Sequence, residues 1–268
     1  KALTEMNGDM DAAVDWLRKK GLATASKKSG RIASEGLIGI SLDHNLGAIV
    51  EVNSETDFVA RNKEFQEFVI SISDVAIKSN GNLDEILVSN FPNSKKNVKD
   101  TLTDKIAKIG ENMSIRRSET VSVSNGAIIG YMHNAVHESL GKIGVILALE
   151  SKADKKDLQK LGKDLAMHVA ATSPSSISID DLSSELVERE RKVLIDQAMS
   201  SGKPEDIAKK MVEGRLRKFY SEVVLLEQIF VIDGETKVSD VIKKVSKELD
   251  HDIKINSFIR YNLGEGIE

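Results

Sequence analysis

The strongest constraint on the fold is a pattern of two short apolar runs followed by an amphipathic helix, which occurs twice in the sequence. In the first copy the runs lie at 37–40 and 48–52, and in the second at 126–129 and 144–149. The helix of the first copy carries Phe65, Phe68, Val69, Ile72, Val75 and Ala76 on one face, with Asn62 as its N-cap, and that of the second carries Leu158, Leu161, Leu165 and Val169. A hairpin with a helix on one face is typical of antiparallel sheets. The pattern therefore predicts an α+β protein with two related subdomains, each with a small antiparallel sheet and helices.

The first residues predict a small helical module at 1–22, which we expect to be truncated. Asp9 follows a turn and is placed to cap a helix of amphipathic spacing, which Gly21 is placed to end. Two short helices around one turn bury little apolar surface, so only part of a module is expected. The polar residues 23–34 predict a linker.

The rest of the chain divides into an N-terminal core subdomain at 35–125 and a C-terminal one at 126–268. Between the two copies the sequence is polar and helical, with a break at Pro92. Within the second subdomain, two amphipathic helices joined at Ser201–Pro204 predict an antiparallel coiled-coil hairpin at about 181–222. Their dense charges leave a narrow apolar seam, so we expect the hairpin to project. Strand patterning returns at 223–232 and 255–263.

Composition excludes several classes of protein. A net charge of −4 and an aromatic content of 4% argue against a surface that binds nucleic-acid phosphates or stacks bases. The absence of cysteine excludes disulfides, thiolate zinc sites and cysteine nucleophiles. The longest purely apolar run, Val145–Leu149, is far shorter than the roughly 20 residues of a membrane span. We expect a cytoplasmic protein.

Motifs for catalysis and cofactor binding are missing from the sequence. Neither Gly141-Lys142 nor Gly202-Lys203 has the serine or threonine and the earlier glycine of a phosphate-binding loop. His133 and His137 are four residues apart, but the glutamate of a zinc-protease motif is absent, so two surface histidines are expected. His168 is expected to lie on a helix and to have a packing role. The sequence thus predicts no covalent chemistry, no direct nucleotide binding, no metal and no cofactor.

One connection between strand and helix differs from its counterpart in the other copy. Thr56–Asn62 contains Phe58 and Val59, whereas the equivalent Ser151–Lys155 is polar. Two interpretations stay open. Phe58 folds back to staple the start of the helix, with Thr56 or Asp57 as an early cap, or it is an exposed aromatic anchor for a partner protein.

The sequence Glu51–Asn62 resembles the signature of the elongation factor Ts family, which exchanges the nucleotide of elongation factor Tu. Further segments that resemble this family, in the same order, are Ile109–Arg117, Ala166–Ala171, Ser201–Pro204, Met211–Arg215 and Gly264–Glu268. Lys1–Glu5 and Asn7–Asp9 are similar to its ubiquitin-associated-like N-terminal module. The resemblance extends over most of the chain.

This resemblance implies a guanine nucleotide exchange factor that binds GDP-bound and nucleotide-free elongation factor Tu. In the family the phenylalanine of the motif enters the GTP-binding domain of the partner and disturbs its Mg²⁺ and phosphate sites, so that GDP leaves. Carried over, the wedge is Phe58, with Thr56, Asp57 and Val59 around it. Ile109 and His133 match further partner contacts, and the hairpin matches a part that docks on or near the partner.

Two other functions remain open from the sequence. One is a scaffold that docks through the hairpin without catalysing exchange. The other is an RNA-associated protein that uses the basic residues of the second hairpin helix, which the net charge disfavours.

Overall fold

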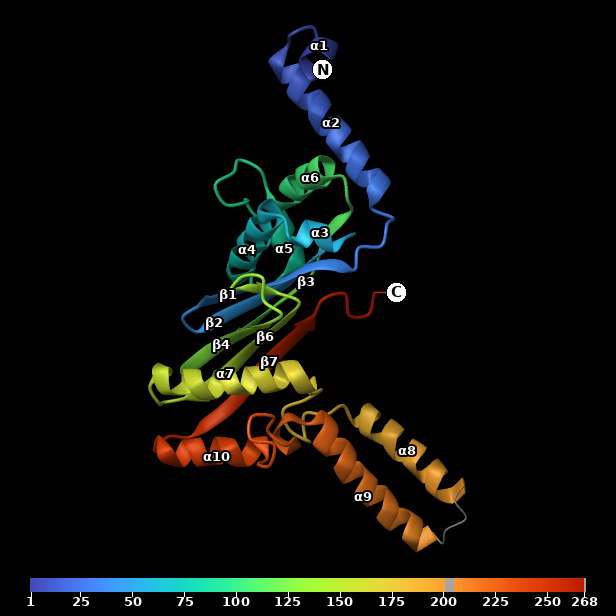
Figure 1. Ribbon diagram of the computed structural model, residues 1–268, viewed down its shortest axis with the longest axis vertical. Helices are drawn as coiled ribbons and strands as arrows, with labels where there is room; N and C mark the ends of the chain where they lie inside the picture. Colours follow the sequence, from blue (N-terminus) through green and yellow to red (C-terminus); the bar gives the residue numbers. More distant parts are fainter. Residues whose placement is uncertain (201–204, 268) are drawn as a thin grey trace. The chain divides into compact units, whose positions relative to one another are not determined.

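The computed structural model describes residues 1–200 and 205–267 (Figure 1). The chain forms two compact units. Unit 1 consists of Lys1–Val123, Ile128–Ile146 and Phe258–Glu268, and unit 2 of Ser124–Ala127 and Leu147–Ser257. In the described part of the chain, none of the helices has the length and apolar character to cross a membrane.

Unit 1 contains a four-stranded sheet of order β3-β2-β1-β5. Its strands are β1 (Glu35–Asp43), β2 (Leu46–Ser54), β3 (Met113–Ser122) and β5 (Leu140–Gly141). β1 and β2 form an antiparallel hairpin in which Glu35 pairs with Ser54 and Asp43 with Leu46. The predicted first hairpin is confirmed. β3, which pairs antiparallel to β2, was not predicted.

Helix α4 (Lys63–Lys78) packs on the β1–β2 hairpin and encloses the core of unit 1 (Figure 1). The predicted N-cap is confirmed, because the Asn62 side chain accepts the Glu64 N–H. A Cβ on Gly39 of β1 would lie 2.4 Å from the Ser73 Oγ of α4, so glycine permits this close approach. Beyond α4 come α5 (Leu83–Val88) and α6 (Val98–Ile109), separated around Pro92 as predicted.

The N-terminal helices are α1 (Ala2–Glu5) and α2 (Met10–Lys28). Asp9 caps α2 as predicted, accepting the Ala12 N–H. The prediction that Gly21 ends this helix is wrong, and residues 23–28 of the predicted linker are helical. A Cβ on Gly21 would lie 3.7 Å from the Ala107 Cβ of α6, so this glycine lies where α2 packs on α6.

The second sheet has the order β4-β6-β7, with β4 (Gly126–His133), β6 (Ile143–Ser151) and β7 (Ile253–Asn262). The strand runs predicted for the second copy and for 255–263 are confirmed. In unit 2, α7 (Lys155–Thr172) is capped by Asp154 and carries the predicted buried leucines. The fold is thus mixed α and β with two small antiparallel sheets.

Helices α8 (Ser184–Ser200) and α9 (Glu205–Val223) lie side by side (Figure 1). They pack through a small apolar cluster of Leu194, Ala198, Val212 and Leu216. The predicted turn Ser201–Pro204 lies outside the described residues. Two amphipathic helices at these positions are confirmed.

The chain after α9 differs from the prediction. Val223 is the last residue of α9, and residues 224–232 form a 3₁₀ turn, η1 (Leu225–Glu227), and irregular backbone, so the predicted strand is wrong. The buried imidazole of His168 on α7 explains the difference. It accepts the Val231 N–H at 3.2 Å and pairs with the Gln228 side chain at 2.8 Å, which holds the segment on the helix. A further helix, α10 (Val238–Glu248), was not predicted.

Candidate functional site

The segment singled out in the sequence forms a single helical turn, α3 (Asp57–Ala60), directly after β2. Phe58 is 75% exposed, whereas Val59 and Ala60 are 5% and 6% exposed and belong to the core of unit 1. The interpretation in which Phe58 folds back onto the helix start is therefore wrong. An aromatic ring stands in solvent on a turn whose next two residues are fixed in the core.

Thr56 lies at the start of this turn and is bound by a carboxylate from elsewhere in the sequence. The Thr56 N–H and Oγ1–H donate to the two oxygens of Glu111, at 3.0 and 2.8 Å. Asp57 forms an ion pair with Arg61 at 2.7 Å. The Arg61 side chain is 74% exposed and that of Asp57 40%, so solvent screens this pair and it contributes little to stability.

A second carboxylate, that of Glu55, accepts a hydrogen bond from the residue that follows Glu111. It accepts the Asn112 N–H at 2.5 Å and pairs with Arg31 at 3.4 Å. The hydrogen bond from Asn112, opposed by burial and aided by Arg31 and Lys28, lowers the pKa of Glu55. The end of β2 is thereby tied to the segment after α6.

The two remaining predicted residues lie in different places. Ile109 is the last residue of α6, is half-buried and packs against the core of unit 1, two residues before Glu111. His133 ends β4, in the other sheet, and is exposed, with its Nδ1 3.2 Å from the Tyr131 hydroxyl. Ile109 therefore lies two residues from the carboxylate that binds Thr56, whereas His133 lies on a strand of the other sheet.

His133 and His137 are both exposed, as predicted. Within residues 1–200 and 205–267, no group of three or more histidine or acidic side chains is arranged to hold a metal ion.

The strand that leads into the turn carries a buried charge that sequence reasoning missed. Glu51 is 0% exposed and binds both Arg117 (Nε at 2.6 Å) and Arg116 (Nη1 at 3.1 Å). A β-bulge in the β2–β3 pairing explains how two consecutive arginines reach one carboxylate. Glu51 pairs with Arg117 and Val52 with Ile115, so Arg116 is the extra residue.

Two more donors complete the shell of Glu51. The Asn53 Nδ2 donates at 3.0 Å and the Gly264 N–H at 2.9 Å. Burial by itself raises the pKa of Glu51, but the bonds from Gly264, Asn53 and Arg117 outweigh it, and the net pKa is lowered. The carboxylate is therefore charged in the folded protein at neutral pH.

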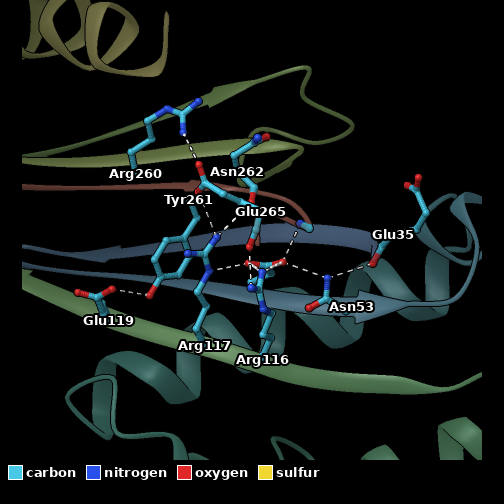
Figure 2. Close-up of polar contacts among 11 residues, drawn as sticks. Glu35, Asn53, Arg116, Arg117, Glu119, Arg260, Tyr261, Asn262 and Glu265 are labelled. Atoms are coloured by element: carbon cyan, nitrogen blue, oxygen red, sulfur yellow. Dashed lines mark hydrogen bonds and ion pairs between the residues drawn. The ribbon is translucent and has the colours of Figure 1, made fainter. Parts of the chain in front are cut away.

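The same arginines bind the last residues of β7 and the segment that follows it (Figure 2). Arg117 donates to the Asn262 carbonyl at 3.1 Å and stacks 4.0 Å over the Tyr261 ring, while Arg116 donates to the Glu265 carbonyl at 2.6 Å. Burial and a hydrogen bond to Glu119 raise the pKa of Tyr261. A charged residue inside the apolar run 48–52, together with an arginine doublet, is the sequence signal that could have revealed this cluster.

Comparison with known proteins agrees with the motifs. The sequence model of the family described as "Elongation factor TS" matches residues 55–265. Elongation factor Ts of Rhodospirillum centenum is 53% identical over 268 residues, which is 100% of this chain and 87% of that protein. Elongation factor Ts of Parvibaculum lavamentivorans is 52% identical over 267 residues, again covering 100% of this chain and 87% of the relative. The chain belongs to the elongation factor Ts family.

Proposed function

We propose that this chain is a nucleotide exchange factor for elongation factor Tu and acts through binding alone, without covalent chemistry. The observation that carries the proposal is the Phe58 turn, in which a 75% exposed ring stands on a backbone fixed by two core residues. Aromatic side chains held in this way are typical of the anchors that dominate binding energy at protein interfaces.

The proposed mechanism is a population shift in the partner. Phe58 enters the GTP-binding domain and disturbs the Mg²⁺ and phosphate sites, so the factor binds nucleotide-free elongation factor Tu more tightly than the GDP-bound form. By linkage, GDP affinity falls by the same factor. The Mg²⁺ and the nucleotide belong to the partner.

The neighbours of Phe58 have different parts in this proposal. Thr56 and Asp57 shape the start of the turn, and Val59 supports it from within the core. Ile109 and His133 are proposed as further contacts with the partner.

The size of the proposed effect follows from the ring. Burying a phenylalanine side chain contributes about 1.5–3 kcal/mol, so insertion made only in the nucleotide-free state lowers GDP affinity by roughly ten- to hundredfold. Other contacts that differ between the two states add to this.

Other parts of the chain have proposed roles in the same complex. We propose that α8 and α9 form an antiparallel coiled-coil hairpin that docks on or near the partner, since they share an apolar seam. α1 and α2 are proposed as part of a ubiquitin-associated-like module. The proposed core subdomains are 35–125 and 126–268, and the proposed site of action is the cytoplasm, where translation takes place.

The test is the release of a fluorescent GDP analogue from elongation factor Tu with this chain, with Phe58→Ala and with Val88→Ala. Val88 is 71% exposed on α5 and serves as the matched control for loss of an exposed apolar side chain. We expect strong acceleration by the wild type and by Val88→Ala and a loss with Phe58→Ala. A folded wild type that binds without accelerating release would instead support a scaffold.

A further inference from the structure

We infer that Glu111 is a positioning residue that holds the Phe58 turn in the conformation that acts on the partner. The inference rests on the proposed function. It concerns four residues, Glu55, Thr56, Glu111 and Asn112, which we call the carboxylate clamp.

The carboxylate clamp is reciprocal. Glu111 accepts the backbone N–H of Thr56, the residue after Glu55, and Glu55 accepts the backbone N–H of Asn112, the residue after Glu111. Each carboxylate therefore fixes the backbone beside the other. Because bonds to a charged acceptor are stronger than neutral ones, the arrangement locks two loops that are far apart in sequence.

The turn depends on such contacts. α3 has four residues, and an isolated helical turn is not stable in water. The Thr56 hydroxyl at its N-cap is committed as a donor to Glu111. Val59 and Ala60 fix the turn in the core, and Glu111 fixes its start, so together they set the direction of Phe58.

The backbone next to Glu111 is held by contacts of its own. Gly110, at a φ of +84°, ends α6 in the left-handed conformation and turns the chain toward β2. The Lys28 ammonium donates to the Gly110 carbonyl, and Lys108 of α6 binds Glu64 of α4 at 2.6 Å. The clamp thus joins Phe58 to the end of α6.

Removing the Glu111 carboxylate frees the Thr56 N–H and hydroxyl, and the start of α3 then samples other conformations. Because the fraction of molecules with a competent turn falls, we expect Glu111→Ala to lower the maximal rate of GDP release about tenfold. The half-saturating concentration of the factor stays within about twofold, since Glu111 acts on the turn and the rest of the docking surface is intact.

The experiment measures GDP release from elongation factor Tu over a range of factor concentrations for Glu111→Ala and for Glu67→Ala. Glu67 is an exposed glutamate on α4 and serves as the matched control. The Phe58→Ala variant and the double variant complete a mutant cycle. A positioning role predicts that Glu111→Ala has almost no further effect once Phe58 is lost. An equal fold-loss in both backgrounds would overturn the inference.

A second measurement does not depend on exchange activity. Amide hydrogen exchange of Thr56, whose N–H donates to Glu111, should quicken at least tenfold in the free Glu111→Ala protein, and Glu111→Gln, which keeps one acceptor oxygen, should recover part of the protection. Unchanged protection would overturn the clamp even if the proposed function holds. If wild type failed to accelerate GDP release, the proposed function would fail, and the amide data would still decide whether the clamp holds the turn.

Discussion

Replacement of Glu51 by glutamine tests the buried cluster in which this residue of β2 binds Arg116 and Arg117 of β3. The glutamine side chain keeps the shape of glutamate but offers one acceptor oxygen where the carboxylate receives Arg116, Arg117, Asn53 and Gly264. Its amide group would also face donors. The substitution removes the buried counter-charge of both arginines and leaves Arg117 with only the more distant carboxylate of Glu265, at 3.7 Å.

The magnitude follows from the burial of each partner. Removing one member of a buried ion pair costs about 3–5 kcal/mol. The Arg116 and Arg117 side chains are 27% and 30% exposed and recover some hydration, so we take the lower end, about 3 kcal/mol. For a chain of this size each kcal/mol lowers Tm by about 2–4 °C, which gives a fall of about 6–12 °C.

The pH dependence has a definite sign. The pKa of Glu51 is lowered on folding, so its contribution is fully present above the ordinary value of 4.5 and is lost as pH falls through the folded pKa. The difference between wild type and Glu51→Gln should be constant between about pH 6 and 8 and should shrink below about pH 4.5.

The assay is calorimetric or urea unfolding at several pH values, with Glu67→Gln as the exposed control, which should lose less than about 0.5 kcal/mol. A loss under about 1 kcal/mol in Glu51→Gln would refute the reasoning. A difference that stayed constant down to pH 3 would also refute it, because the charge would then not be the cause.

Three further predictions concern other parts of the chain. Gly36→Ala should destabilise the β1–β2 hairpin by several kcal/mol, because the φ of Gly36 is +127° and the new Cβ would lie 2.1 Å from the Val52 carbonyl oxygen. Urea unfolding measures the loss of stability, and a loss under about 1 kcal/mol would contradict the prediction. Burial lowers the pKa of His168, so the neutral ring stabilises the fold above about pH 6.5, and this stabilisation is lost as the pH falls further. Urea unfolding should therefore show a larger loss of stability between about pH 7.5 and 5.5 for the wild type than for His168→Gln. Parallel plots of stability against pH for the two proteins would contradict the assignment. Leu216 is 1% exposed in the apolar seam between α8 and α9, so Leu216→Ala should destabilise their packing by about 2–5 kcal/mol. Amide exchange should then be faster in both helices. Unchanged exchange would show that the seam does not hold them together.

Local signals were sufficient for the elements whose determinants lie close in sequence. The hairpin strands, the caps Asp9 and Asn62 and the core face of α4 follow from periodicity and capping chemistry. The prediction that Gly21 ends its helix was wrong because sequence rules place glycine at helix ends, whereas this glycine lies where α2 packs closely on α6.

The missed features depend on contacts between distant segments. Residues 223–232 have the composition of a strand, but His168 of α7 binds Gln228 and the Val231 N–H and so holds this segment out of a strand. The binding of Thr56 by Glu111 joins residues 55 positions apart, which spacing along the chain cannot reveal. The motif itself marked the position of Phe58, but only the structure distinguishes an exposed ring from one folded back.

The most direct test of the account is the affinity of this chain for elongation factor Tu without nucleotide and at saturating GDP, measured for wild type and Phe58→Ala. The ratio of the two affinities is the coupling between the factor and GDP, and it must equal the factor by which the chain weakens GDP binding. We predict a large ratio for wild type that falls about tenfold or more when Phe58 is replaced. A ratio that Phe58→Ala leaves unchanged would contradict the proposal that this exposed ring drives GDP release.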